Sequence, residues 1–322
     1  MFLVVFLTGC SQGPEHRETP DLWSPEVLFE LPPGAFFEGI AVNGDGQVFL
    51  NERTEHVVYR YEVGEPVAAW SRPAKGIELA GLAADAGGRL FASGRGHDGV
   101  QAIFLVTEAG AQTVARVPDA VFLNGVTFLT DRMLIAAESF LGVADGSSLG
   151  RIFSIDVETG LVEVFLEHEL LGRNDESNAA YPAANGIKVF EEWLFVTNSE
   201  RAAVLRVPLS GELQAGTPEV FAAGVTGDDF AVAEDGTLFV TTHPMNTLVR
   251  VSLDGTLERV AGAGHGMVGS TAAAFGRTEA DASSLYVVTN GGSYIPPPTG
   301  VETAKFLRVL TDTRFYEPSP HR

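Results

Sequence analysis

Four oxygen-bearing side chains recur at equivalent points of a repeating pattern in this sequence. They are Glu38, Asn124, Asn185 and Asp228, and each opens a short segment of small and apolar residues. Carboxylate and amide oxygens are hard donors, and Ca²⁺ takes about six to eight oxygen ligands in a flexible geometry. Two carboxylates also balance the two positive charges of such an ion. The sequence therefore predicts that these four side chains hold a Ca²⁺-type divalent cation.

Two other interpretations of these positions were weighed. No histidine or cysteine occupies them, so a structural zinc site is a poor match, although Mg²⁺, Mn²⁺ or Zn²⁺ are alternatives to Ca²⁺ as the bound ion. Asn-Gly and Glu-Gly pairs are also common turn residues. Because four such positions fall in register, we favour the metal site.

Six similar units must position these side chains. They are anchored at residues 38, 80, 124, 185, 228 and about 271, which are separated by 42, 44, 61, 43 and 43 residues. Each unit has a turn rich in Gly, Asp or Asn between strand-like segments, as propeller blades of about 40–45 residues do. The pattern predicts an all-β protein, a six-bladed β-propeller over residues 26–312, with an insertion around residues 172–178. Equivalent innermost residues of such blades converge on the propeller axis.

An open propeller would expose a strand edge, which invites aggregation. The apolar segment 27–31 precedes the first unit and has no partner within it. We expect this N-terminal strand to join the last blade, within residues 284–310, and so to close the ring.

Composition limits the classes of partner. The chain has 322 residues, is 45% hydrophobic and carries a formal net charge of −21. Such a protein buries a sizeable core and repels phosphate backbones, so we expect no nucleic acid partner. A small-molecule lactone or ester is the expected partner, and a monomer the expected state.

The N-terminus carries the single cysteine, Cys10, after an apolar run. Leu7-Thr8-Gly9-Cys10 resembles the lipobox of bacterial lipoproteins, although no Lys or Arg precedes the run. This predicts a signal peptide over residues 1–9, lipidation of Cys10, a tether over residues 10–25 and a C-terminal tail over residues 313–322. The expected location is the bacterial cell envelope, with the lipid anchor as the sole membrane attachment.

The segments FEGIAV at Glu38, ANGIKV at Asn185 and GDDFAVAEDGTLFV at Asp228 carry a family resemblance. The chain resembles the regucalcin–gluconolactonase (senescence marker protein) family over about residues 27–310, and more distantly paraoxonase and diisopropylfluorophosphatase. The resemblance implies that Glu38, Asn185 and Asp228 hold a catalytic metal. It also implies that Asn124 is a further ligand or a substrate contact, and that His243 lies beside the active site.

The chain departs from this family at two positions. Paraoxonases have a histidine where this chain has Ala80, and sugar-lactone members have an arginine where it has Phe122. Aromatic residues then predict a more apolar substrate pocket than a sugar site, and its expected members are Phe37, Phe122, Tyr181 and Tyr294.

The resulting hypothesis is metal-assisted hydrolysis of a lactone or similar ester, with a phosphotriester as the second substrate class. Asp228 is expected to act as base or nucleophile, with both options open. Neighbouring residues of a strand face opposite sides. Asp229 is therefore expected to point away from the metal and to orient Asp228 or act as a capping residue. The rival hypothesis is a lipid-anchored binding scaffold in which the ion is structural.

Overall fold

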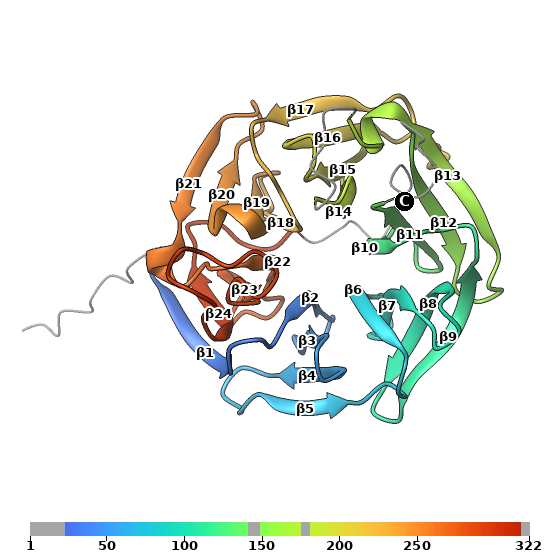
Figure 1. The fold of residues 1–322 in the computed structure, drawn as a ribbon. Helices are drawn as coiled ribbons and strands as arrows, with labels where there is room; N and C mark the ends of the chain where they lie inside the picture. Colours follow the sequence, from blue (N-terminus) through green and yellow to red (C-terminus); the bar gives the residue numbers. More distant parts are fainter. Residues whose placement is uncertain (1–22, 141–148, 175–180, 317–322) are drawn as a thin grey trace, which may run out of the picture.

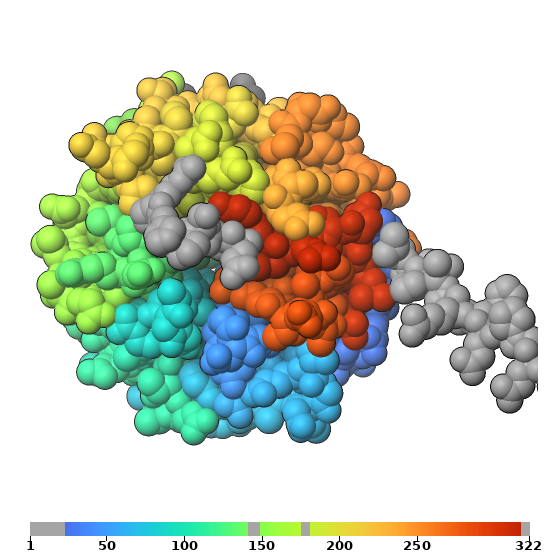
Figure 2. Space-filling view, turned by 180° about the vertical axis from the view of Figure 1, so that it is seen from behind, coloured from blue at the N-terminus to red at the C-terminus, as the bar shows by residue number. Residues whose placement is uncertain are grey.

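The computed structural model describes residues 23–140, 149–174 and 181–316. Six four-stranded antiparallel sheets surround a central axis, as expected for a six-bladed β-propeller (Figure 1). Viewed from the opposite side, the blades follow one another in sequence order, and the red last blade lies beside the blue N-terminal segment (Figure 2). The predicted fold class is confirmed.

Within each blade, the four strands are ordered from the axis outward. The innermost strands are β2 (Phe37–Val42), β6 (Glu78–Ala84), β10 (Leu123–Phe128), β14 (Ala184–Phe190), β18 (Phe230–Val232) and β22 (Ser270–Phe275). The second strands are β3 (Val48–Glu52), β7 (Leu90–Arg95), β11 (Met133–Glu138), β15 (Trp193–Asn198), β19 (Leu238–Thr242) and β23 (Ser284–Thr289). The predicted anchors at 38, 80, 124, 185 and 271 lie within innermost strands, and residue 228 lies just before β18.

The outer half of each blade is built in the same way. The third strands are β4 (Val57–Tyr61), β8 (Gln101–Thr107), β12 (Gly150–Asp156), β16 (Ala203–Pro208), β20 (Thr247–Val251) and β24 (Ala304–Leu310). The outermost strands are β5 (Ala68–Ser71), β9 (Gly110–Val117), β13 (Val162–His168), β17 (Glu219–Ala223), β21 (Leu257–Ala261) and β1 (Pro25–Leu31). Three short 3₁₀ helices are described: η1 (Glu169–Leu171), η2 (His243–Met245) and η3 (Ala263–His265).

The N-terminal strand closes the ring. β1 pairs with β24 in the order β1-β24-β23-β22, and Pro25 lies opposite Val309. The edge that the last blade would otherwise expose is therefore covered, as the sequence predicted.

The propeller also takes in residues next to its predicted limits. The backbone N–H of Trp23 donates to the carbonyl of Leu310 at 3.1 Å, within the segment predicted as a tether. In the predicted tail, Phe315 forms a bridge with Ala233, and the Tyr316 ring lies 4.5 Å from the Phe190 ring. Aromatic side chains at both ends supply the apolar area that holds these segments to the blades.

The core lies between neighbouring blades. One cluster joins Phe91 and Ile103 of the second blade to Leu134 and Phe153 of the third. All five residues of β3 are buried, because blades pack against both of its faces. The outermost strand β13 instead has only half-buried and exposed residues, since one of its faces meets solvent. Within the described residues, no helix has the length and apolar character needed to cross a bilayer.

Candidate active site on the propeller axis

Glycines let the innermost strands approach one another closely at the axis. A Cβ atom on Gly39 would lie 2.6 Å from the carbonyl oxygen of Ala80, and one on Gly81 would lie 2.6 Å from that of Asn124. In the same way, a Cβ on Gly186 would lie 2.8 Å from the carbonyl oxygen of Asp228. The residue before each glycine is thereby held at the same level around the axis.

Polar side chains of the second strands fix the axial backbone of the next blade. Asn51 Nδ2 donates to the carbonyl of Ala80 at 3.0 Å, and Thr197 Oγ1 donates to that of Asp228 at 2.7 Å. The hydroxyl of Ser93 donates to the carbonyl of Asn124. These buried polar groups are satisfied across blade boundaries, so they set the relative height of the axial residues.

Asp228 is the centre of the axial site. Asn185 Nδ2 donates to Asp228 Oδ1 at 2.6 Å and lies 3.1 Å from Ser199 Oγ. On the other side, Asp228 Oδ2 lies 3.3 Å from His243 Nδ1. Both carboxylate oxygens of Asp228 therefore contact polar groups from the neighbouring strand β14 and from η2.

His243 is held from behind by Asn290. Asn290 Oδ1 accepts the backbone N–H of Gly292 at 2.8 Å, which turns the amide nitrogen of Asn290 toward His243 Nε2, 2.7 Å away. An amide nitrogen only donates, so in the neutral imidazole Nε2 accepts and Nδ1 carries the proton toward Asp228. Asn290 thus sets both the orientation and the tautomer of His243.

The electrostatics of the site follow from two buried carboxylates close together. Burial raises the pKa of Glu38, Arg53 lowers it and Asp228 raises it, and the net direction is upward. Burial lowers the pKa of His243, but the hydrogen bond and charge of Asp228 and the charge of Glu38 outweigh it and raise the pKa. This axial cluster of acidic side chains therefore favours a nearby positive charge.

Arg53 was not predicted from the sequence, and it pairs with the axial carboxylate of Glu38. Its Nη1 atom lies 3.5 Å from Glu38 Oε1. The guanidinium carbon lies 5.5 Å from the centre of the Phe36 ring and 5.8 Å from that of Phe122. Two aromatic faces thus hold a cation beside the axial carboxylates.

The structure places the aromatic residues near the axis in different surroundings. The Phe36 ring lies 5.8 Å from the His243 ring, and the half-exposed Tyr294 ring lies 5.8 Å from His243 on another side. Phe37, predicted to line the pocket, is fully buried and packs against Tyr59 in the core between blades. Strand alternation explains this correction, because Phe36 shares the side of Glu38 and Phe37 faces the opposite way.

Other predicted residues take up different places. Asn124 is buried at the axial level, between Gly81 and Gly125. Tyr181 lies before β14, where its carbonyl accepts from Arg173 Nη1 at 2.5 Å. Cys10 and residues 175–178 of the predicted insertion lie outside the described residues.

Asp229 faces away from Asp228 and pairs with lysine. Lys188 Nζ lies 2.5 Å from Asp229 Oδ1 and 5.5 Å from the centre of the Phe230 ring. Burial raises the pKa of Asp229, and the Lys188 charge opposes that rise. Lys188 therefore provides Asp229 with its own counter-charge, and Asp228 is left as the carboxylate that faces the pocket.

The donor chemistry of the axial residues fits a hard divalent cation. Glu38 and Asp228 repel each other, so a cation between them would stabilise both carboxylates. Asn124 and Asn185 carry amide oxygens that would serve as further ligands. Within the described ranges, no cluster of three or more His, Cys, Asp or Glu side chains is arranged to hold a metal. A bound ion must therefore rely on these two carboxylates together with amide oxygens and water.

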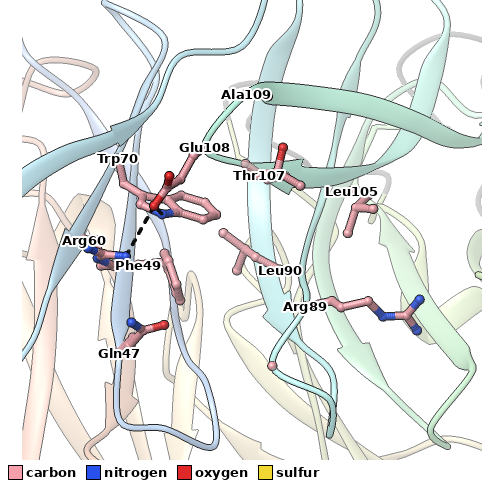
Figure 3. A pocket seen from close by; sticks show the side chains of 12 residues that line it. Gln47, Phe49, Arg60, Trp70, Arg89, Leu90, Leu105, Thr107, Glu108 and Ala109 are labelled. Carbon is pink, nitrogen blue, oxygen red and sulfur yellow. Dashed lines mark hydrogen bonds and ion pairs between the residues drawn. The ribbon is translucent and has the colours of Figure 1, made fainter.

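A separate groove lies between the first and second blades (Figure 3). Its volume is about 710 Å³, and its walls include Phe49, Trp70, Arg60, Arg89 and Glu108. Trp70 Nε1 donates to Glu108 Oε1 at 3.2 Å, and Arg60 Nη1 lies 3.7 Å from the same oxygen. This groove holds none of the predicted site residues.

Comparison with known proteins finds two sequence relatives, both described as putative hetero-Diels-Alderases, and many similar folds. No protein-family model matches the chain. The chain is 26% identical over 350 residues to the putative hetero-Diels-Alderase asR5 of Sarocladium schorii, covering 92% of this chain and 86% of that protein.

The similar solved structures have lower sequence identity. A luciferin-regenerating enzyme has a TM-score of 0.67 at 14% identity, covering 91% of this chain and 97% of its own. A gluconolactonase from Xanthomonas campestris has a TM-score of 0.66 at 14% identity, covering 89% of each chain. The calcium-binding protein regucalcin from Agrobacterium tumefaciens has a TM-score of 0.62 at 16% identity, covering 91% of this chain and 97% of its own. These neighbours are the proteins that the sequence motifs resembled, and at such identities they establish the shared propeller fold.

Proposed function

We propose that the axial site is the active site of a hydrolase that opens lactones or related esters with the help of a Ca²⁺-type cation. The observation that carries this proposal is the buried position of Asp228 between Asn185 and His243, close to a second carboxylate, Glu38. Perturbed titratable groups gathered in one pocket are typical of active sites. The gluconolactonase and regucalcin folds are consistent with the same use of the axis.

Glu38, Asn124, Asn185 and Asp228 are the residues that would hold the cation. When bound, it would polarise the carbonyl oxygen of the substrate and stabilise the negative charge that develops there. The protein's own residues position the other reactants. Phe36 covers His243 on one side and so limits access of bulk water.

Proton transfer falls to Asp228 and His243. In lactone hydrolysis, water adds to the carbonyl carbon and gives up one proton, the ring C–O bond breaks, and the departing oxygen takes a proton to form a hydroxy acid. Asp228 acts either as the base for this water or as a nucleophile, and the N–H of His243 at Nδ1 points toward Asp228 across their 3.3 Å contact and stabilises its negative charge. Asn290 keeps His243 in the orientation that this contact needs.

The test is hydrolysis of simple lactones and esters by the protein with Ca²⁺ and with excess chelator. We expect activity that requires the ion, together with calorimetric Ca²⁺ binding that weakens in Glu38→Gln. Full activity in chelator would contradict the role of the cation. Inactivity across the panel, with ion binding intact, would favour the binding-scaffold hypothesis, and phosphotriesters in the panel test the second substrate class.

The sequence relative favours a second candidate, a hetero-Diels–Alder cycloaddition. Such a reaction joins a diene to a two-atom partner in one step and needs no proton transfer, so apolar walls and one hydrogen-bond donor can promote it. Phe36, Phe122 and Tyr294 would supply the walls, and Arg53 the donor. Cyclisation of a polyene carbonyl compound that persists in chelator would support this candidate over hydrolysis.

Attachment to the cell envelope through Cys10 is a proposal based on the N-terminal motif alone. Cell fractionation of the native chain beside Cys10→Ser tests it, and release of the variant from membranes is the expected result.

A further inference from the structure

A small cavity adjoins the axial site on the side of the second blade. Its volume is about 290 Å³, and Arg53, Glu78, Ala80, Arg95, Gln101 and Phe122 contribute to its walls. A cavity of this volume has room for several waters or for one small organic group. Ala80, which stands at the axial position of the second blade and carries no oxygen donor, is part of the cavity wall.

The polar groups of this cavity are mainly hydrogen-bond donors. Arg95 Nη2 lies 2.8 Å and 2.9 Å from the two oxygens of Glu78, so the cavity's acidic group is already paired. Gln101 Oε1 accepts the backbone N–H of Leu123 at 3.0 Å, which leaves the amide N–H groups of Gln101 for a ligand. A ligand in this cavity must therefore supply acceptors.

Arg53 is the strongest of these donors. Within the described part of the chain, its polar contact is the ion pair with Glu38 at 3.5 Å, too long for a strong hydrogen bond. Phe36 and Phe122 hold the guanidinium in place, so little side-chain freedom is lost when a ligand binds. A guanidinium presents a planar fork of N–H groups that matches a carboxylate with two parallel hydrogen bonds.

We propose that the substrate of the axial site is an acid: a lactone or ester whose own carboxylate binds Arg53 and Gln101 in this cavity. The carboxylate would hold the reacting carbonyl group over the axis, next to Asp228. The inference rests on the proposed hydrolytic function for the reacting bond, but the carboxylate subsite follows from the cavity itself.

The kinetic test uses two lactones with the same five-membered ring. The γ-lactone of α-hydroxyglutaric acid carries a carboxylate where γ-valerolactone carries a methyl group. We expect the wild type to prefer the acid by about tenfold or more in kcat/KM, the scale of one charged hydrogen-bonded pair. Arg53→Gln should abolish this preference, and Arg53→Lys should keep part of it, because lysine retains the charge but not the fork.

The double variant Glu78→Gln/Arg95→Gln is the matched control within the same cavity. It removes a pair that is already satisfied and leaves no unpaired charge, so the preference for the acid should stay within about threefold of the wild type, a difference under 1 kcal/mol. A preference that falls equally in Arg53→Gln and in this double variant would overturn the assignment of Arg53.

A binding measurement separates this inference from the proposed function. Calorimetry with cyclopentanecarboxylate, and with its neutral amide as the comparison, needs no turnover. We expect the acid to bind the wild type and to bind Arg53→Gln about tenfold more weakly. Thermal melting confirms that the variant is folded.

The outcomes are distinguishable. Carboxylate binding that depends on Arg53, without hydrolysis of any lactone, would contradict the hydrolase proposal and support the subsite. Hydrolysis without a preference for the acid would support the hydrolase and overturn the subsite, as would failure of the wild type to bind the carboxylate.

Discussion

The groove between the first two blades is more than twice as large as the cavity beside Ala80, with about 710 Å³ against about 290 Å³. Its charges nevertheless lie in solvent: the side chain of Glu108 is 74% exposed, and that of its partner Arg60 is 37% exposed. At the axis, the side chains of Glu38 and Asp228 are only 11% and 14% exposed.

Burial makes the interactions of the axial charges stronger than those of the exposed charges in the groove. Exposed ion pairs contribute little because water screens them, whereas buried carboxylates need counter-charges, and burial raises the pKa of Glu38. The arrangement of charge, rather than the size of a hollow, therefore distinguishes the axis from the groove. The following variants test this contrast.

The largest effect is expected from Asp228→Asn. This change removes the charge that pairs with His243, so turnover should fall about 100-fold or more, the scale of a lost acid–base group. Asp229→Asn should reduce turnover less, because Asp229 is committed to Lys188. Steady-state kinetics on one lactone measures both, and equal losses would contradict the division of roles between the two aspartates.

Asn290→Leu should have the next largest effect. Leucine keeps the approximate volume of the side chain but cannot donate to His243 Nε2, so turnover should fall about 10-fold to 100-fold, as for other partners that orient a reactive histidine. Nitrogen-15 NMR of His243 should show a mixture of tautomers in the variant. An unchanged tautomer would show that Asn290 does not control it.

Gly125→Ala tests the close packing of the axial strands. The new Cβ would meet the carbonyl oxygen of Asn185, and it would lie 2.9 Å from Gly186 Cα. Overpacking of this kind costs about 1–3 kcal/mol in the free energy of unfolding. Gly211→Ala is the control, because nothing lies within 4 Å of its Cβ; equal urea midpoints for the two variants would contradict this view of the axis.

The smallest effect is expected in the groove. Arg60→Gln removes exposed ion pairs of 3.6 Å and 3.7 Å, so the free energy of unfolding should change by about 0.5 kcal/mol or less. Lactone turnover should match the wild type. A large loss of turnover would mean that the groove, rather than the axis, takes part in the reaction.

Repetition made the architecture predictable. Intervals between equivalent residues indicated six blades, and the unpartnered apolar segment 27–31 indicated how the ring closes. Blade register also placed Glu38, Asn185 and Asp228 on the axis, because a propeller maps equivalent sequence positions to equivalent places.

The entrance to the site was harder to predict. Arg53 follows β3 and Asn290 follows β23, and side chains beyond a strand end have no register to fix their direction. Phe36 was also missed, although alternation from Glu38 is a signal that could have placed it on the axial side. The pairing of Lys188 with Asp229 links two blades and had no signal in the spacing of either.

The pairing of β1 with β24 has a consequence for biosynthesis. The ribosome releases β1 before any other strand of the propeller and β24 after all of them, so the sixth sheet stays unfinished throughout translation. Nascent chains carry an unmatched strand that chaperones must shield. A chain cut short before Ala304 would lack that partner permanently, so premature termination should yield aggregates instead of a shorter working protein.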